Sequence, residues 1–308
     1  MLHLSHMQRI RLKWGLIFIS PWILGFLLFL LYPMLASMYY SFTDYDVLRP
    51  PRWVGLGNYV YFFTRDNLAF TCIYNTLYFA VFSVPLSILV AVALSLLLNA
   101  RVKGLAVFRA IFFIPSIVPV VSTAILWVWL FNTKNGLFNV ALRAIGLQGV
   151  GWLTDPSWAK PSMIIMTLWG VGGTVIIYLA GLQDIPSQLY EAATIDGAGT
   201  WQQIVRITIP LLTPQIFFQL VMGVIGAFQV FTQAFIMGGL GGGALGMGSE
   251  AGPANALLFY SFYLYLNAFR FFRMGYASAM AWVLFAITLM CTLLILRSSR
   301  RWVFYGGA

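Results

Sequence analysis

The stretch that decides the fold is NTLYFAVFSVPLSILVAVALSLLLN, residues 75–99, which contains no charged side chain. An α-helix needs about 20 apolar residues to cross the hydrocarbon core of a bilayer. The stretch is long enough for one crossing. It is continuously apolar instead of alternating over about ten residues, which favours a helix over a strand of a membrane barrel. The sequence therefore predicts a transmembrane helix here.

The rest of the chain has the same character. Of its 308 residues, 61% are hydrophobic and 8% are charged, and the mean hydropathy is +0.86. Soluble domains carry about 25% charged residues, so this composition excludes a soluble fold. Six apolar stretches are predicted to span the membrane: 16–37, 75–98, 111–131, 163–182, 211–237 and 274–296. We therefore expect an all-α membrane protein with six transmembrane helices in a single domain over residues 1–308.

Basic side chains near the ends of the predicted spans indicate the orientation. They gather before the first span, between the second and third, and after the sixth: Arg9, Arg11, Lys13, Arg101, Lys103, Arg109, Arg297, Arg300 and Arg301. These positions alternate correctly for one side of a six-span chain, and loops rich in Lys and Arg stay in the cytoplasm. Both termini are predicted to be cytoplasmic. The net charge of +10 is therefore attributed to membrane edges and not to nucleic-acid binding.

A row of small and amide residues runs along the fifth predicted span. Gln219, Gly223, Gly226, Gln229 and Gln233 recur at spacings of four, three, three and four, which puts them on one face of a continuous helix. An amide that faces lipid costs free energy unless it finds a partner or water. Together with Gly170 and Gly173 of the fourth span, these residues are predicted to line a solute path. The alternative is that the glycines only permit close helix packing.

No acid or base lies deep in any predicted span, whereas carriers coupled to protons or sodium usually keep an ionisable group near the midplane. An uncharged path suits a neutral polar solute such as a sugar, with an energy source outside this chain. The glycine-rich loop 237–258 lacks the phosphate-binding pattern G-x-x-x-x-G-K-[ST] and is predicted to be a flexible outer connection. No metal-binding or catalytic constellation is evident, so enzyme chemistry is not expected. A stand-alone channel, a secondary carrier, and a membrane scaffold or enzyme subunit remain alternatives.

The segment between the fourth and fifth spans, residues 186–210, has a different composition. A helix is predicted to begin at Ser187, a glycine-bearing turn at 196–199, and a second helix at the capping box formed by Thr200 and Gln203. Pro210 is predicted to mark the point where this second helix yields to the fifth span. The segment is therefore expected to be a helix-turn-helix at the cytoplasmic face.

Glu191 and Asp196 bear directly on the role of this segment. Only eight residues of the chain are acidic, yet these two lie five positions apart beside an anionic membrane surface. A helix that merely stabilises the bundle at the interface would normally present Lys or Arg. Acidic residues are better explained by a protein partner that offers basic or donor groups.

The same residues resemble a known family. E-A-A at 191–193, D-G-A at 196–198, and Ile207, Ile209 and Pro210 after them look like the EAA loop of permease subunits of bacterial ABC importers. Ile204 and Ile209 depart mildly from the residues common at their positions, an aromatic and a leucine. Residues 75–99 and the stretch FRAIFFIPSIVPVVSTAILWVWLF resemble the MalF-like sugar permeases of the carbohydrate-uptake class.

The resemblance implies a type I ABC importer permease fold in the bacterial inner membrane, with cytoplasmic coupling helices. It implies that this chain forms half of the path for a sugar, foremost an oligosaccharide, with a glycerol 3-phosphate or other small-solute permease as the alternative. Implied partners are a second, MalG-like permease in a heterodimer, two ATPase subunits that hold ATP and Mg, and an extracytoplasmic binding protein. No cofactor is expected in this chain. The residues implied to couple to the ATPase are Glu191, Ala192, Ala193, Asp196, Gly197, Ala198, Gly199 and Pro210.

Overall fold

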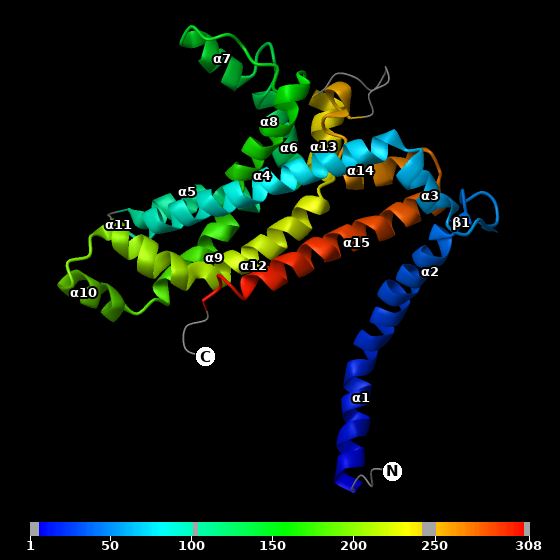
Figure 1. Cartoon of the computed structure of the whole chain (residues 1–308), viewed down its shortest axis with the longest axis horizontal. Coiled ribbons are helices and arrows are strands. Elements are labelled where there is room, and N and C mark those ends of the chain that lie inside the picture. The colour runs from blue at the N-terminus through cyan, green and yellow to red at the C-terminus, as the bar shows by residue number, and fades with distance from the viewer. Residues whose placement is uncertain (1–5, 101–103, 242–250, 305–308) are drawn as a thin grey trace. The chain divides into compact units, whose positions relative to one another are not determined.

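The computed structural model describes residues 6–100, 104–241 and 251–304 (Figure 1). By its internal contacts the chain divides into two units. The first comprises Met1–Arg65 with Leu264–Val283, and the second comprises Asp66–Tyr263 with Leu284–Ala308. Each unit is described by itself.

The first unit begins with one long helical segment and continues in a small hairpin. Its elements are α1 (His6–Phe26), the π-helical turn η1 (Leu27–Leu31), α2 (Tyr32–Ser41), β1 (Thr43–Asp44), β2 (Arg52–Trp53), α3 (Gly57–Thr64), η5 (Leu266–Arg270) and the first part of α15 (Met274–Ser299). The two strands pair antiparallel, with Thr43 opposite Trp53. Asn58 donates from its amide nitrogen to the carbonyls of Ser41 and Thr43, which holds α3 against the hairpin.

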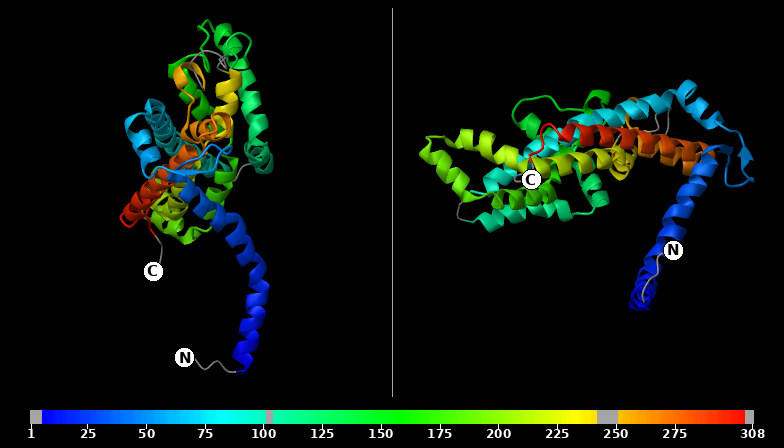
Figure 2. Two further views of the ribbon diagram at one scale, coloured as in Figure 1. Left: turned by 90° about the vertical axis from the view of Figure 1, so that its right-hand side faces the viewer. Right: turned by 60° about the horizontal axis from the view of Figure 1, so that its bottom comes forward.

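The second unit is built around α4; Figure 2 shows two further views of the whole chain. Its elements are α4 (Asn67–Leu98), α5 (Leu105–Ile117), α6 (Val120–Leu130), α7 (Leu137–Ala144), α8 (Pro156–Trp169), α9 (Gly172–Gln183), α10 (Ser187–Ile195), α11 (Thr200–Gln203), η2 (Ile204–Thr208), α12 (Ile209–Phe228), α13 (Thr232–Ile236), η3 (Met237–Gly241), η4 (Pro253–Asn255) and α14 (Tyr260–Tyr265). Helices α8, α9 and α12 all pack against α4. Side chains of α4 and α9 form a buried cluster with Ala91, Val175 and Tyr178 at its centre.

Local capping explains where two of these helices begin. Asp66, 5% exposed, accepts hydrogen bonds from the backbone N–H groups of Leu68 and Ala69 and so caps α4. Asp155 caps α8 by accepting from the N–H and hydroxyl of Ser157, and these bonds hold the pKa of the Asp155 carboxyl below its usual value. Both helices start earlier than predicted because the sequence analysis placed their beginnings at the first long apolar run.

Four helical stretches of the described residues are long and apolar enough to cross a membrane: Ile10–Ser41, Asn67–Leu98, Thr200–Phe228 and Met274–Ser299. Two further pairs qualify only when taken together. Leu105–Ile117 with Val120–Leu130 is bent by 100°, and Pro156–Trp169 with Gly172–Gln183 is bent by 50°. The described part of the chain therefore contains up to six spans. Each of the predicted spans 111–131 and 163–182 corresponds to one of these bent pairs.

The 100° bend follows from Pro119. The residue before a proline avoids the helical region, and Val118 is extended, with φ −66° and ψ 130°. Pro119 then caps α6. By contrast, Pro85 lies inside α4 without ending it. The second bend lies where α8 ends at Gly170 and α9 begins two residues later.

The fifth span also differs from its prediction. The helix runs without a break from Thr200 to Phe228 and passes through Pro210. The π-helical turn at Ile204–Thr208 precedes the proline, and the N–H of Ile209 bonds to the carbonyl of Ile204. This wider turn shifts the hydrogen-bond register where the proline ring would otherwise meet the carbonyl four residues earlier. The predicted helix end at Pro210 is therefore wrong, and so is the predicted continuation from Phe228 to residue 237.

The predicted flexible connection 237–258 lies partly outside the described residues. The described part that follows, residues 251–258, is packed inside the second unit: Ala251 is 1% exposed, and Leu257 and Leu258 are fully buried. Hydrogen bonds from the N–H of Leu257 to the carbonyl of Ala251 and from the N–H of Ala256 to that of Pro253 fold it into tight turns. For these residues the prediction of flexibility is wrong.

Candidate functional site: residues 186–210 and an uncharged pocket

Residues 186–210 are called the coupling segment here, after the role predicted for them, and the turn at 196–199 has the predicted backbone geometry. Gly197 has φ +80°, a conformation that residues with a Cβ atom rarely adopt. The N–H of Asp196 bonds to the carbonyl of Ala192, and the N–H of Ala198 to that of Ala193. The chain therefore reverses immediately after α10, and α10 and α11 lie next to each other at one end of the second unit (Figure 1).

The start of the second helix differs in detail from the predicted capping box. Gly199, and not Thr200, is the capping residue, and its N–H donates to the side-chain oxygen of Gln202 at 3.0 Å. Gln203 instead donates from its amide nitrogen to the hydroxyl of Thr194 at 3.0 Å and to the carbonyl of Ala198. Gln203 thus ties the two helices together. Ser187 begins α10 without a side-chain capping bond.

A second tie joins α10 to the long helix. The hydroxyl groups of Tyr190 and Thr208 lie 2.9 Å apart in a hydrogen bond. Because Thr208 belongs to the unbroken helix from Thr200 to Phe228, this bond joins α10 directly to the fifth span. Pro210 lies within that helix.

The outer surface of the segment combines acidic and apolar side chains. Glu191 and Asp196 are exposed, and neither makes an ion pair within the described part of the chain. Ile195 is 86% exposed and Trp201 is 74% exposed beside them. The sequence analysis missed these two residues, although an isoleucine and a tryptophan next to acidic positions in a short amphipathic segment were a usable signal. Exposed apolar anchors of this kind are typical of protein contact sites.

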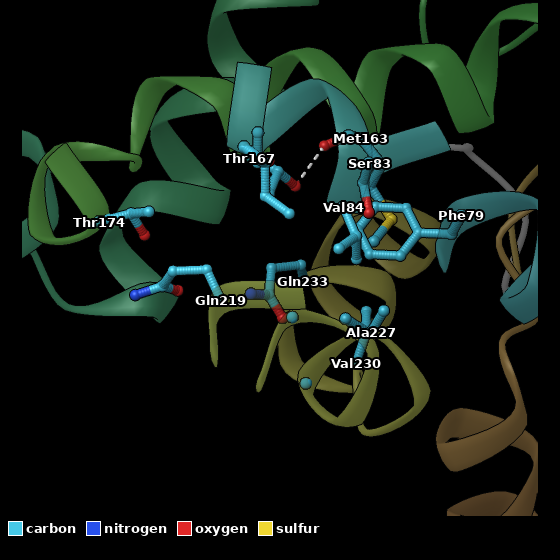
Figure 3. Close-up of a pocket in the computed structure, with 14 residues that line it drawn as sticks. Phe79, Ser83, Val84, Met163, Thr167, Thr174, Gln219, Ala227, Val230 and Gln233 are labelled. Atoms are coloured by element: carbon cyan, nitrogen blue, oxygen red, sulfur yellow. Dashed lines mark hydrogen bonds between the residues drawn. The ribbon is translucent and has the colours of Figure 1, made fainter. Parts of the chain in front are cut away.

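The second unit also contains a pocket of about 200 Å³ between α4, α8, α9, α12 and α13 (Figure 3). The polar side chains that line it are all uncharged: Ser83, Ser87, Thr167, Thr174, Gln219 and Gln233. The hydroxyl of Ser87 is buried and has no hydrogen-bond partner among the described residues. A pocket of this composition can exchange hydrogen bonds with a neutral polyhydroxyl solute and offers no counter-charge for an ion.

The structure brings together four of the seven predicted path residues. Gln219, Gly223, Gly226 and Gln233 line the pocket. Gly223 allows close approach of α12 to α4, since a Cβ atom there would lie 2.9 Å from a methyl carbon of Val84. Gly226 faces open space, because an added Cβ atom would have no neighbour within 4 Å. The two glycines therefore have different roles.

The other three predicted path residues do not line this pocket. The helix ends at Phe228, so Gln229 caps it with φ −99° and ψ 6° and leaves the helical face. Gly170 ends α8 at the second bend, and Gly173 lies in the first turn of α9. Gln229 was placed on the row because the fifth span was predicted as one continuous helix. Conversely, the sequence analysis missed Ser83 and Ser87, whose spacing of four in α4 could have indicated a polar stripe.

Lys160 is a basic residue that lies just before residue 163, the predicted start of the fourth span. Because α8 begins at Pro156, Lys160 lies inside this helix, one turn from its start. Its ammonium group donates to the side-chain oxygen of Asn75 at 3.1 Å. It also lies 5.1 Å and 5.4 Å from the ring centres of Tyr74 and Tyr78, within the range of a cation–π contact.

Comparison with known proteins assigns the class. Residues 83–303 match the family described as "Binding-protein-dependent transport system inner membrane component", and the chain belongs to this family. It is a multi-pass permease component of an ABC transporter, as the resemblance of its EAA-type segment predicted. The family is a transport component and not an enzyme.

Several individual proteins are similar over nearly their whole length. YesP of Bacillus subtilis, a probable ABC transporter permease, is 41% identical over 94% of this chain and 92% of its own. The lactose permease protein LacF of Rhizobium radiobacter is 35% identical over 88% of both chains, and the trehalose/maltose permease protein MalF of Thermococcus litoralis is 31% identical over 94% of both. A solved bacterial ABC transporter for the acidic polysaccharide alginate has a TM-score of 0.81 at 27% identity and covers 96% of this chain and 98% of its own.

Proposed function

We propose that this chain is the permease subunit of an ATP-driven importer for a neutral sugar, foremost an oligosaccharide, and that it forms half of the translocation path. The observation that carries the proposal is the uncharged, hydroxyl- and amide-lined pocket in a chain of the permease family. Relatives named for lactose, trehalose or maltose, and arabinooligosaccharides support a saccharide. Lining residues Gln219 and Gln233, with the unbonded hydroxyl of Ser87, would hydrogen-bond sugar hydroxyls.

The proposal includes partner proteins that supply the energy for transport and that deliver the sugar. A second, MalG-like permease would complete the path, and two ATPase subunits would bind ATP and Mg. An extracytoplasmic binding protein would deliver the sugar, in keeping with the family description. The alginate transporter has been solved in complex with a periplasmic protein that carries an alginate pentasaccharide.

The proposed drive begins at the coupling segment. Glu191 and Asp196 would pair with basic or donor groups of the ATPase, while Ile195 and Trp201 would fill an apolar cleft. Movement of this contact would pass through the Gln203 and Tyr190 ties into the helix from Thr200 to Phe228. Gln219 lies about 28 Å along that helix from Thr200 at about 1.5 Å per residue. A rigid displacement would therefore reshape one wall of the pocket.

The test is uptake by the complete transporter in proteoliposomes, with a panel of labelled mono- and oligosaccharides and with ATP present or absent. Glu191→Lys reverses the charge at the proposed contact and is expected to abolish ATP-dependent uptake in complexes that assemble normally. Asp184→Lys is the matched control, because Asp184 is exposed and lies outside residues 186–210. Uptake by Glu191→Lys at the wild-type rate would refute the coupling role.

Competition experiments distinguish a neutral sugar from the alternative classes of solute. Glycerol 3-phosphate or an acidic saccharide should require a cationic group in the pocket, and no lining residue is charged. Competition by an anionic saccharide but not by neutral ones would therefore contradict the proposed solute. A stand-alone channel or secondary carrier would pass solute without ATPase subunits.

A further inference from the structure

Residues 251–260 pack behind Phe79 at the end of the pocket that is predicted to face outward. Phe79 is the lining residue nearest the start of α4, and Phe259 packs edge-on against it with ring centres 5.5 Å apart. Phe259 is fully buried, as are Leu257 and Leu258 before it. Phe79 therefore lies between the pocket and the buried segment packed behind it.

Side chains of α4 hold this segment in place. Asn75, 1% exposed, donates both hydrogen bonds of its amide nitrogen, to the carbonyl of Asn255 at 2.9 Å and to that of Leu258 at 3.1 Å. The hydroxyl of Thr76 accepts a hydrogen bond from the N–H of Tyr260 at 3.0 Å. These contacts join residues about 180 positions apart in the chain.

Lys160 fixes the orientation of the Asn75 amide. Its ammonium group donates to the amide oxygen, so the amide nitrogen must point toward the two carbonyls. A flipped amide would put its NH₂ group against the ammonium and its oxygen against both carbonyls, which leaves every bond unmade. A hydrogen bond from a charged donor is stronger than one between neutral groups.

The helical register places this contact directly outside the pocket. Lys160, Met163 and Thr167 follow each other at spacings of three and four on α8, and the last two line the pocket. On α4, Asn75 lies four residues before Phe79 and eight before Ser83, which are also lining residues. Residues at these spacings share one helix face, so the Lys160–Asn75 contact lies one turn beyond the pocket on both helices.

We propose that Asn75, Thr76 and Lys160 form an outer latch that holds residues 251–260 over the pocket, with Lys160 as the positioning residue. The latch keeps the pocket closed to the outside in the resting state and opens when sugar is admitted from that side. This role rests on the proposed function, because it concerns admission of the same sugar to the same pocket. Lys160 acts through Asn75 and does not itself contact the solute.

The test measures access to the pocket from outside in cells that express the complete transporter. A single reporter thiol is introduced as Ser87→Cys in a Cys72→Ala, Cys291→Ala background, and a membrane-impermeant methanethiosulfonate is added externally. Lys160→Met removes the charged donor but keeps most of the stem. We expect Lys160→Met to speed labelling about tenfold. A tenfold ratio corresponds to a loss of about 1.4 kcal/mol of the free energy that favours the closed state. Lys160→Arg should restore slow labelling.

Lys134→Met is the matched control, because Lys134 is exposed and lies outside the latch. Equal labelling rates for Lys160→Met and Lys134→Met would overturn the proposal. So would selective loss of uptake of glucuronide-bearing sugars in Lys160→Met with unchanged labelling, because Lys160 would then contact an anionic solute. Asn75→Leu removes the two amide donors and should also speed labelling; if that variant fails to assemble, Lys160→Met decides. Absence of saccharide uptake by the wild type would refute the proposed function while the labelling ratio still tests the latch.

Discussion

Gly223 and Gly226 have different structural roles, although both lie in α12. A side chain at Gly223 would press on Val84, whereas one at Gly226 would project into open space at the pocket. Gly226 therefore contributes volume to the pocket instead of permitting close packing. The sequence alone does not distinguish these roles, because both residues lie on the same predicted helix face. The neighbouring side chains in the structure do distinguish them.

Gly226→Val is expected to narrow the pocket and to discriminate by solute size. Uptake efficiency for a trisaccharide should fall about tenfold or more relative to a monosaccharide, because added carbon atoms in a fitted site cost this much. Initial uptake rates over a range of concentrations measure the effect. Gly173→Val is the control, since an added Cβ atom at Gly173 would also meet nothing within 4 Å, but Gly173 does not line the pocket. A uniform loss for all sugars would contradict the size argument.

Gly172 supports a prediction about stability. A Cβ atom at Gly172 would collide with the carbonyl of Phe112, whereas one at Gly173 would meet nothing within 4 Å. Gly172→Ala should therefore lower the free energy of unfolding by about 1–3 kcal/mol through overpacking, and Gly173→Ala should not lower it. Thermal unfolding of the detergent-solubilised transporter compares the two variants. Equal midpoints would show that α9 and α5 do not approach each other closely.

At the scale of elements, the coupling turn depends on one positive φ angle. Gly197→Ala forces a Cβ atom into the left-handed region at a cost of about 1–2 kcal/mol, whereas Gly199, at φ −71°, accepts alanine without this strain. We expect Gly197→Ala to transport fewer sugar molecules per ATP hydrolysed and Gly199→Ala to retain the wild-type ratio. Parallel measurement of ATP hydrolysis and uptake checks this. The same ratio in both variants would mean that the turn does not set the coupling geometry.

The transmembrane helices were predictable because the apolar runs are long. Inside the bilayer, every backbone polar group of such a run must find its hydrogen-bond partner within the protein, which favours a helix. The breaks were not predictable from proline alone. Pro119 lies at a 100° bend, Pro85 lies inside an intact helix, and Pro210 is accommodated after a π-helical turn. Whether a proline ends a helix depends on what satisfies the freed carbonyl, and that is decided by neighbouring elements.

At the scale of the whole molecule, the source of energy decides between the proposed importer and a self-sufficient transporter. This chain purified alone and placed in liposomes is expected to show no sugar flux, with or without ATP. The complete transporter should show flux only with ATP and the binding protein. Flux by the single chain would support a channel or carrier. A hydrolysis-deficient ATPase pair is the matched control for the complete transporter.

The two parts of the candidate site differ in how much the sequence could reveal. The turn at Gly197 is set by local chemistry, so the two helices and the turn between them were predicted, whereas the helix end at Pro210 was not predicted correctly. The pocket depends on contacts between distant parts of the chain, so the sequence did not single out Ser83 and Ser87, and Gln229 does not line it. Lys160 was overlooked because helix capping by Asp155 starts α8 earlier than hydropathy indicates.

The exposed side chains of Ile195 and Trp201 have a consequence for the abundance of the protein in the cell. Under the proposed function, a subunit made without the proposed ATPase would leave this apolar pair and the carboxylates of Glu191 and Asp196 uncovered. Exposed apolar surface of this kind marks a subunit for degradation, so the half-life of this permease should follow the supply of the proposed ATPase. Pulse-chase labelling with and without ATPase expression would measure that dependence. Replacement of Ile195 and Trp201 by serine would lengthen the half-life of the orphan subunit.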